Sequence, residues 1–271
     1  MNKPRQPMFH AVPDAERLAK AKQYTDRVVG HLMALFPTHE ANQLVIYGDT
    51  LSRQIPPSYA AHAFNQFQQN MHLMELLRLC ALWDKPGADR ESIPTILALI
   101  DKPEIVHTLA DATHRFYANE LTATHLTPFK DADHQAAYEA WWEDERKTRA
   151  DEEAAKLRTW LDEARASGET AQASPELTAL REFRDGYIAH NLSLPEPDPN
   201  APTKVQGLRY GDETKLLETS IEITDRLHLA LNGTSFDWNG SREIAASNAE
   251  ELWGACQFIG ITRNRRKSLR T

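Results

Sequence analysis

The segment from Arg181 to His190 (Arg-Glu-Phe-Arg-Asp-Gly-Tyr-Ile-Ala-His) carries the residues of this sequence that are best suited to chemistry. On a helix with about 100° per residue, its apolar side chains form one stripe, and Arg184 and His190 lie toward opposite margins of that stripe. A guanidinium offers a planar fork of donors to phosphate oxygens, and an imidazole can exchange a proton near neutral pH. The pair could therefore bracket a phosphate.

A helix over about residues 175–191 must position these two side chains. Ser174 is a suitable N-cap and Pro175 suits the first helical position, so we expect the helix to begin there. The preceding stretch, 165–174, contains Ser-Gly and is expected to be a flexible break. After His190, four prolines between 195 and 202 predict a stiff, extended connection.

The other long segments also show helical periodicity, and no convincing strand pattern is present. The sequence therefore predicts an all-α fold of about seven to nine helices. The longest expected helix, 131–166, is rich in charged residues and is expected to be solvated, with an arm toward a partner as the alternative. The other expected helices cover 14–36 (ended by Pro37), 38–53, 57–83, a short helix capped by Ser92 and ending before Pro103, 103–126, 211–231, and about 241–258.

The pattern Arg184-Asp185, four residues and His190 resembles the R-x(4–6)-H motif of the HEPN superfamily (higher eukaryotes and prokaryotes nucleotide-binding), in which a polar residue follows the Arg. Two flanking segments are similar to the branch of that superfamily linked to abortive infection: a helical region at 59–84 ending in Leu-Trp-Asp, and Gly-Leu-Arg-Tyr-Gly-Asp-Glu-Thr at 207–214. The resemblance covers about residues 10–235. Leu192 departs from it, because some family members carry there a Tyr that accepts a nucleotide modification, so that regulation is not implied.

The resemblance implies an all-α, HEPN-like helical bundle with additional helices and the long charged helix. It also implies a homodimer that acts as a metal-independent endoribonuclease, a toxin or phage-defence effector, with the Arg and His of both protomers in one composite cleft. His190 would transfer a proton and Arg184 would stabilise the transition state. Asp185 points away from Arg184 on the helical wheel and is expected to have a supporting catalytic role.

The expected organisation is one HEPN-like domain over 1–235, with a C-terminal helix and basic tail over 236–271 packed on it. RNA is the expected partner, and an antitoxin or another defence-system protein is a further candidate. The net charge of −8 argues against a broad electrostatic surface for nucleic acid, so a basic groove would be local. The residues expected to contact RNA are Arg181 and, in the tail, Arg263, Arg265, Arg266 and Lys267.

The composition, with 41% hydrophobic and 26% charged residues, is that of a globular protein with a sizeable core. Cys80 and Cys256 both lie in apolar helical contexts and are expected to be core residues in a reducing compartment. Neither a signal region nor a membrane span is recognisable, which favours a cytoplasmic protein. His107 and His114 share a helix face but lack a third ligand, so we expect no metal and no cofactor.

Three other interpretations stay open. Arg184 could form an ion pair with an acidic group of a neighbouring helix, while His190 is a polar group near a helix C-terminus. The motif could belong to a non-catalytic module that binds a nucleotide, RNA or a partner protein, which the overall acidity and the charged helix favour. The chain could also be a plain helical scaffold.

Overall fold

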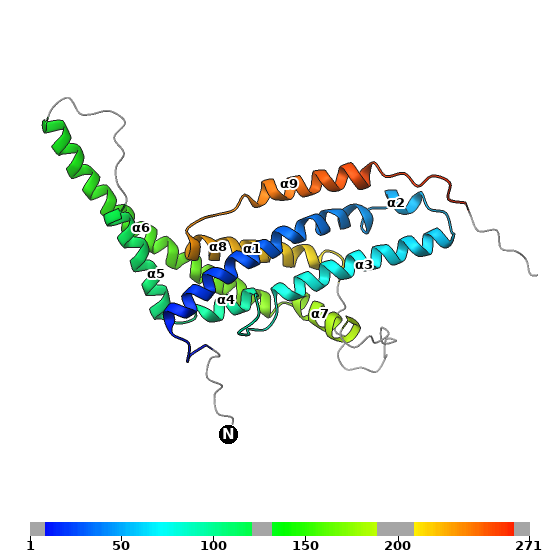
Figure 1. Cartoon of the computed structure of the whole chain (residues 1–271), viewed down its shortest axis with the longest axis horizontal. Helices are drawn as coiled ribbons and strands as arrows, with labels where there is room; N and C mark the ends of the chain where they lie inside the picture. Colours follow the sequence, from blue (N-terminus) through cyan, green and yellow to red (C-terminus); the bar gives the residue numbers. More distant parts are fainter. Residues whose placement is uncertain (1–8, 121–131, 189–208, 263–271) are drawn as a thin grey trace, which may run out of the picture. The chain divides into compact units, whose positions relative to one another are not determined.

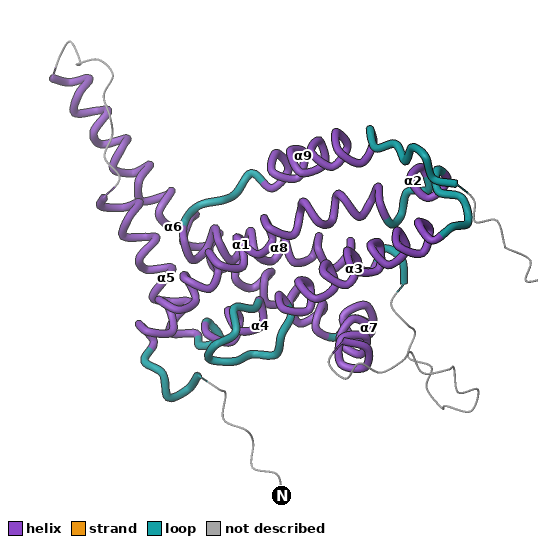
Figure 2. Tube along the Cα trace, turned by 45° about the vertical axis from the view of Figure 1, so that its right-hand side comes forward, coloured by secondary structure: helices purple, strands orange, loops and turns teal. Residues whose placement is uncertain are grey.

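A computed structural model of the chain describes residues 9–120, 132–188 and 209–262. Within these ranges the chain forms nine α-helices and three single π-helical turns, and no strand (Figures 1 and 2). The predicted all-α class is therefore confirmed. None of the described helices is long and apolar enough to cross a membrane.

The first five helices are α1 (Asp14–Val45), α2 (Thr50–Arg53), α3 (Tyr59–Leu82), α4 (Ile93–Leu99) and α5 (Pro103–Arg115), and α5 continues into the π-turn η1 (Phe116–Glu120). They are followed by α6 (Ala132–Gln172), α7 (Pro175–Phe183), the π-turn η2 (Arg184–Ile188), α8 (Asp212–Asn232), α9 (Trp238–Ala249) and the π-turn η3 (Glu250–Gly254).

The predicted end of the first helix at Pro37 is wrong, because α1 continues through Pro37 to Val45. Of the expected second helix, 38–53, only Thr50–Arg53 forms a helix separate from α1. A proline inside a helix removes one backbone hydrogen bond and costs about 3 kcal/mol. Buried side chains beyond Pro37, namely His39, Asn42 and Val45, offset that cost.

The expected flexible break at 165–174 is also wrong, because α6 runs without interruption to Gln172. Gly168 lies inside the helix, and a Cβ added there would come within 2.4 Å of Leu97 Cδ1 in α4. The glycine thus permits the close approach of two helices, and its helix-weakening entropy is offset by that packing.

The predicted helix starts at Ser92 and Ser174 are confirmed. The hydroxyl of Ser92 accepts a hydrogen bond from the backbone N–H of Thr95, and that of Ser174 accepts one from Leu177, with a proline in the first turn of each helix. The last helix starts slightly earlier than expected, at Trp238, because the Asp237 carboxylate accepts from the Gly240 N–H. These short-range polar contacts satisfy N–H groups that the helix leaves without partners.

The chain divides into two compact units. Unit 1 comprises Met1–Asp26, Lys85–Thr170 and Glu222–Ser235, and unit 2 comprises Arg27–Asp84, Ala171–Ile221 and Phe236–Thr271. Helices α1, α6 and α8 contribute residues to both units. The motif helix α7 belongs to unit 2. The division of the sequence at residue 235 stays a prediction.

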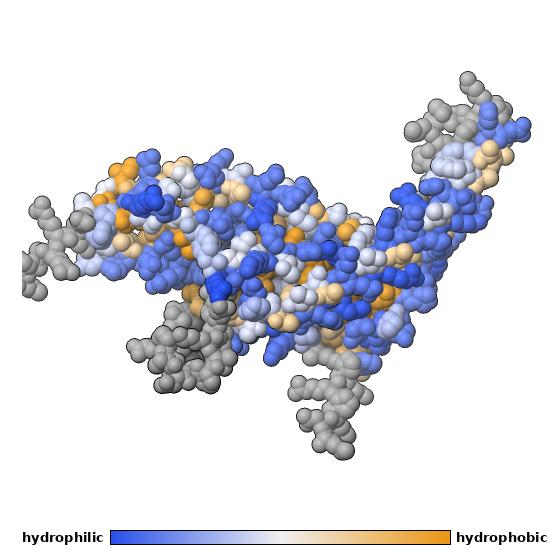
Figure 3. Space-filling model, turned by 180° about the vertical axis from the view of Figure 1, so that it is seen from behind, coloured by the Kyte–Doolittle hydropathy of each residue, from blue (hydrophilic) through white to orange (hydrophobic). Residues whose placement is uncertain are grey.

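In unit 1, α5 and α6 lie side by side, as Figures 1 and 2 show. The guanidinium of Arg149 lies 5.3 Å from the centre of the Tyr117 ring, a cation–π contact between the two segments. Residues 133–149 of α6 include no buried residue, and this part of unit 1 is largely hydrophilic in Figure 3. The expectation that the charged stretch forms a solvated helix is confirmed for this segment.

In unit 2, the second part of α1 packs between α3 and α9 (Figure 1). Arg78 of α3 donates to the carbonyl of Ala34 at 2.9 Å, and Arg242 of α9 binds the Glu40 carboxylate at 2.7 Å. The core beneath is apolar and includes Leu32, Leu35, Phe36, Leu76, Leu79, Leu82, Trp83, Leu177 and Leu180. It holds the end of α3 against α7, where the motif begins.

Candidate functional site

The site is built on the C-terminal end of α3. Trp83, the residue after the helix, is fully buried, and its indole N–H donates to the hydroxyl of Ser220 in α8 at 2.8 Å. Ser220 in turn donates to the Leu216 carbonyl at 2.6 Å. A buried tryptophan with a satisfied N–H fixes the backbone around it, so the orientation of Trp83 also sets the position of Asp84.

Two arginines one helical turn apart bind two consecutive residues at this end of α3. Arg181 in α7 donates to the Trp83 carbonyl at 2.7 Å, and Arg184 in η2 donates from a terminal nitrogen to the Asp84 carboxylate at 2.7 Å. Arg184 thus forms an ion pair with an acidic group at the end of a neighbouring helix, the arrangement expected in the alternative interpretation. The contact of Arg181 anchors α7 to α3.

The helical wheel predicted that Asp185 points away from Arg184, and this prediction is wrong. Its carboxylate accepts from the Arg184 Nε at 2.8 Å and lies 2.8 Å from a second guanidinium nitrogen. The wheel failed because it gives only the direction in which each side chain leaves the helix, whereas the long arginine side chain lets the guanidinium reach the neighbouring carboxylate. Asp84 and Asp185 therefore hold two different edges of one guanidinium.

The cluster is only partly exposed, and its charges balance. The side chains of Arg184 and Asp84 are 29% and 32% exposed, whereas that of Asp185 is 62% exposed. The hydrogen bond to Asp185, with a further one to Asp84, raises the pKa of Arg184, while burial lowers the pKa of Arg181. Two arginines face two aspartates, so a ligand phosphate would have to compete with carboxylates for the guanidinium.

Cys80 lies beneath this cluster and is not a candidate nucleophile. It is buried, and its thiol faces the Leu180 carbonyl at 3.7 Å. Burial raises the pKa of the Cys80 thiol to about 12, so the reactive thiolate is not populated near neutral pH. The expectation of a core residue is confirmed for Cys80, whereas Cys256 is only half-buried.

The other predicted site residues lie outside the described residues. These are His190 and the tail residues Arg263, Arg265, Arg266 and Lys267. The structure therefore brings together Arg181, Arg184 and Asp185 and leaves their relation to His190 a prediction. In the described part of the chain, no group of three His, Cys, Asp or Glu side chains could hold a metal ion.

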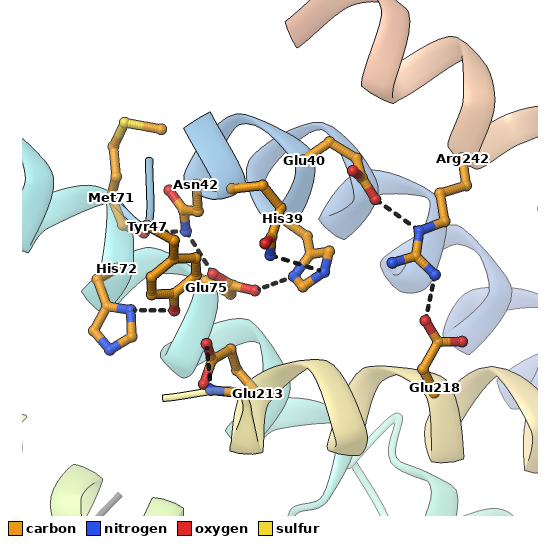
Figure 4. A network of polar contacts seen from close by, with 12 residues as sticks. His39, Glu40, Asn42, Tyr47, Met71, His72, Glu75, Glu213, Glu218 and Arg242 are labelled. Carbon is orange, nitrogen blue, oxygen red and sulfur yellow. Dashed lines mark hydrogen bonds and ion pairs between the residues drawn. The ribbon is translucent and has the colours of Figure 1, made fainter. Parts of the chain in front are cut away.

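A second polar cluster, which sequence reasoning missed, lies inside unit 2 (Figure 4). His39 and Asn42 of α1 both bind the carboxylate of Glu75 in α3, at 2.6 and 2.5 Å, and all three side chains are fully buried. One signal could have located it, since Glu75 is the only acidic residue in α3 and stands in the apolar run Leu-Met-Glu-Leu-Leu. Asp84 could likewise be located in the sequence at the end of Leu-Trp-Asp, but its partner, Arg184, could not be assigned from the sequence.

The fold and the motif define a class. An all-helical chain in which an arginine at the end of one helix is followed six residues later by a histidine has the features of a HEPN protein. The sequence matches the HEPN_AbiU2 family (AbiU2) over residues 16–252, and the chain belongs to this family, which is associated with abortive infection. No curated protein and no solved structure matches the sequence.

Proposed function

We propose that this protein is a metal-independent endoribonuclease that acts in abortive infection as a toxin or phage-defence effector. The observation that carries the proposal is the position of Arg184. Asp84 holds one side of its guanidinium, while the edge formed by Nε and a terminal nitrogen meets, among the described residues, only the more exposed Asp185. The two N–H donors of that edge can bind two oxygens of a phosphate at once.

In this mechanism a substrate phosphate displaces the Asp185 carboxylate from the Arg184 edge, while Asp84 keeps the guanidinium oriented. His190 then deprotonates the ribose 2′-OH or protonates the leaving oxygen, and Arg184 stabilises the negative charge of the transition state. Asp185 has a supporting role, because in the absence of substrate it keeps the phosphate-binding edge in place. The unperturbed pKa of a histidine, near 6.5, suits both directions of proton transfer.

A homodimer is part of this proposal, because one histidine can act as base while its dimer mate acts as acid. Exposed large hydrophobic side chains support self-association through unit 2. Examples in this unit are Phe67, Met74, Leu77, Ile244 and Leu252. A groove of about 390 Å³ between α1 and α3 has no charged side chain in its lining, as is typical of interface cores.

The experiment is single-turnover cleavage of total RNA in excess chelator, with light scattering of each preparation to establish its oligomeric state. His190→Ala should lower the cleavage rate by roughly 10²–10⁴ while leaving RNA affinity nearly intact. Arg184→Ala should lower both, and Arg184→Lys should not restore them fully, since an ammonium lacks the planar fork. Cleavage by His190→Ala at the parent rate would show that this motif is not a ribonuclease site.

A matched control is the tail variant in which Arg263, Arg265 and Arg266 are replaced together. If these residues bind RNA, the variant should weaken binding and flatten its dependence on salt without altering the rate of the bound complex. A monomer in light scattering would contradict the composite site.

The second candidate function is a non-catalytic module that binds a nucleotide, RNA or a partner protein. One observation favours it, the balance of two arginines by two aspartates around the motif, which weakens the attraction for phosphate. The same experiment separates the two candidates. Binding that depends on Arg184 without any cleavage would select the module.

A further inference from the structure

The turn that leads into α8 is held by two buried carboxylates. Asp212 accepts from the Arg209 backbone N–H at 2.7 Å, and Glu213 accepts from the Gly211 N–H at 3.3 Å. Gly211 has a φ of +92°, a conformation that other residues rarely adopt. The turn is therefore rigid, and it presents Tyr210 to solvent with 71% of its surface exposed.

Tyr210 also has a fixed support. Its ring meets that of Tyr47 edge to face, with the ring centres 4.3 Å apart. The Tyr47 hydroxyl contacts His72 Nδ1 of α3 (Figure 4), and these two atoms are 3.2 Å apart. Burial together with a hydrogen bond to Glu213 raises the pKa of Tyr47. Tyr47 is thus a neutral side chain held in place by its contacts, and most of the Tyr210 ring stays exposed to solvent.

The rise per residue along α7 and α3 gives an approximate distance from this turn to Arg184. Lys215, near the start of α8, contacts Glu176 at the start of α7 at 3.2 Å, and Arg184 follows eight residues later, about 12 Å along the helix axis. His72, which supports Tyr47, precedes Asp84 by twelve residues, about 18 Å along α3. Tyr210 and Arg184 belong to the same compact unit, and both side chains are at least partly exposed.

We propose that Tyr210 is a stacking platform for a base of single-stranded RNA whose phosphate is bound at Arg184. The inference rests on the proposed function and extends it to substrate binding. Stacking of a base on an aromatic ring needs an open ring face and no net charge, and it tolerates any base. A protein with a net charge of −8 gains little affinity for RNA from its overall field. Arg209, the exposed residue before Tyr210, would add a local contact for the RNA backbone.

The first test compares four proteins on a short single-stranded RNA that the protein cleaves: the parent, Tyr210→Ala, Tyr210→Phe and Tyr59→Ala. Tyr59 is the matched control, because it is 81% exposed in the same unit and its side chain makes no ring contact among the described residues. Tyr210→Ala should raise KM and the Kd by roughly 5- to 150-fold with kcat nearly unchanged. Tyr210→Phe, which keeps the stacking face, and Tyr59→Ala should behave like the parent.

The second test replaces each base of the RNA in turn by an abasic site. At about 3.4 Å per stacked nucleotide, 12–18 Å corresponds to roughly four or five nucleotides from the phosphate at Arg184. In the parent, an abasic site at that position should weaken binding as strongly as Tyr210→Ala does. In Tyr210→Ala the same abasic site should cause no additional loss, because the base and the ring are partners in one interaction.

The outcomes separate this inference from the proposed function. If His190→Ala and Arg184→Ala abolish cleavage while Tyr210→Ala binds and cleaves like the parent, the ribonuclease stands and the platform is wrong. If the parent binds the RNA without cleaving it and Tyr210→Ala loses binding by fluorescence anisotropy, the platform stands and the ribonuclease is wrong. Absence of RNA binding by the parent, or an equal loss in Tyr59→Ala, would overturn the platform.

Discussion

Two polar clusters of unit 2 use similar residue types in opposite ways. The Glu75 cluster (His39, Asn42 and Glu75) is fully buried, and both oxygens of its carboxylate have partners. The Arg184 cluster (Arg181, Arg184, Asp84 and Asp185) is half-exposed, and its outermost carboxylate is 62% exposed. Both clusters depend on α3, which supplies Glu75 and ends just before Asp84.

Burial is what separates a structural role from a functional one here. A buried, fully paired carboxylate cannot exchange its partners for a ligand without leaving a charge or an amide unsatisfied, which is costly. A half-exposed pair is screened by water and contributes little to folding, so its partners can be exchanged at small cost. We therefore expect the Glu75 cluster to determine stability and the Arg184 cluster to determine ligand binding.

The largest expected effect is on stability, in Glu75→Ala. Removing one partner of a buried pair leaves His39 and Asn42 without their acceptor, and the free energy of unfolding should fall by about 3–5 kcal/mol. Urea denaturation followed by circular dichroism measures the change. Glu182→Ala, at an exposed position of α7, is the control and should change stability by less than about 0.5 kcal/mol. Equal effects of the two substitutions would remove the distinction between the clusters.

The sequence predicted most helices of the fold because their signals are local. Ser92 and Ser174 cap their helices through contacts three residues away, and such pairs are visible in any short window of sequence. The two failures were decided at long range. Helix α1 passes Pro37 because His39 and Asn42 meet Glu75 more than thirty residues later, and α6 passes Gly168 because Leu97 lies against it.

The candidate site was likewise predictable in its local features but not in its long-range contacts. Residue spacing placed Arg184 at the margin of an apolar stripe, and the structure leaves it 29% exposed. Its partner Asp84 could not be assigned from sequence, because the contact joins residues one hundred positions apart. The direction of Asp185 was wrong for a local reason, since helical spacing does not predict how a long side chain such as Arg184 folds back onto its neighbour.

A smaller effect is expected in the Arg184 cluster, from the matched pair Asp84→Asn and Asp185→Asn. Each substitution should change the free energy of unfolding by less than about 1 kcal/mol, because the ion pairs are partly exposed. Their effects on affinity for single-stranded RNA should have opposite signs. Asp185→Asn should raise affinity by roughly 2- to 5-fold, because it removes a carboxylate that competes with phosphate, whereas Asp84→Asn should lower it by freeing the guanidinium to rotate. Fluorescence anisotropy at fixed salt measures both, and changes of the same sign would contradict the different roles of the two aspartates.

The smallest expected effect, from Gly186→Ala, tests whether the half-exposed cluster has space that a ligand needs. Gly186 follows Asp185 in η2, its φ is not positive, and a Cβ added there would meet no atom of the described residues within 4 Å. Alanine loses less chain entropy than glycine in a helical turn, so the protein should become more stable by about 0.5–1 kcal/mol. Thermal unfolding measures the gain in stability, and single-turnover cleavage measures the activity.

If stability rises and activity is unchanged, the cluster binds phosphate through side chains alone. If activity falls while stability rises, the space beside Gly186 is occupied during function by RNA or by the second protomer, and titration of RNA binding in the same variant distinguishes these two occupants.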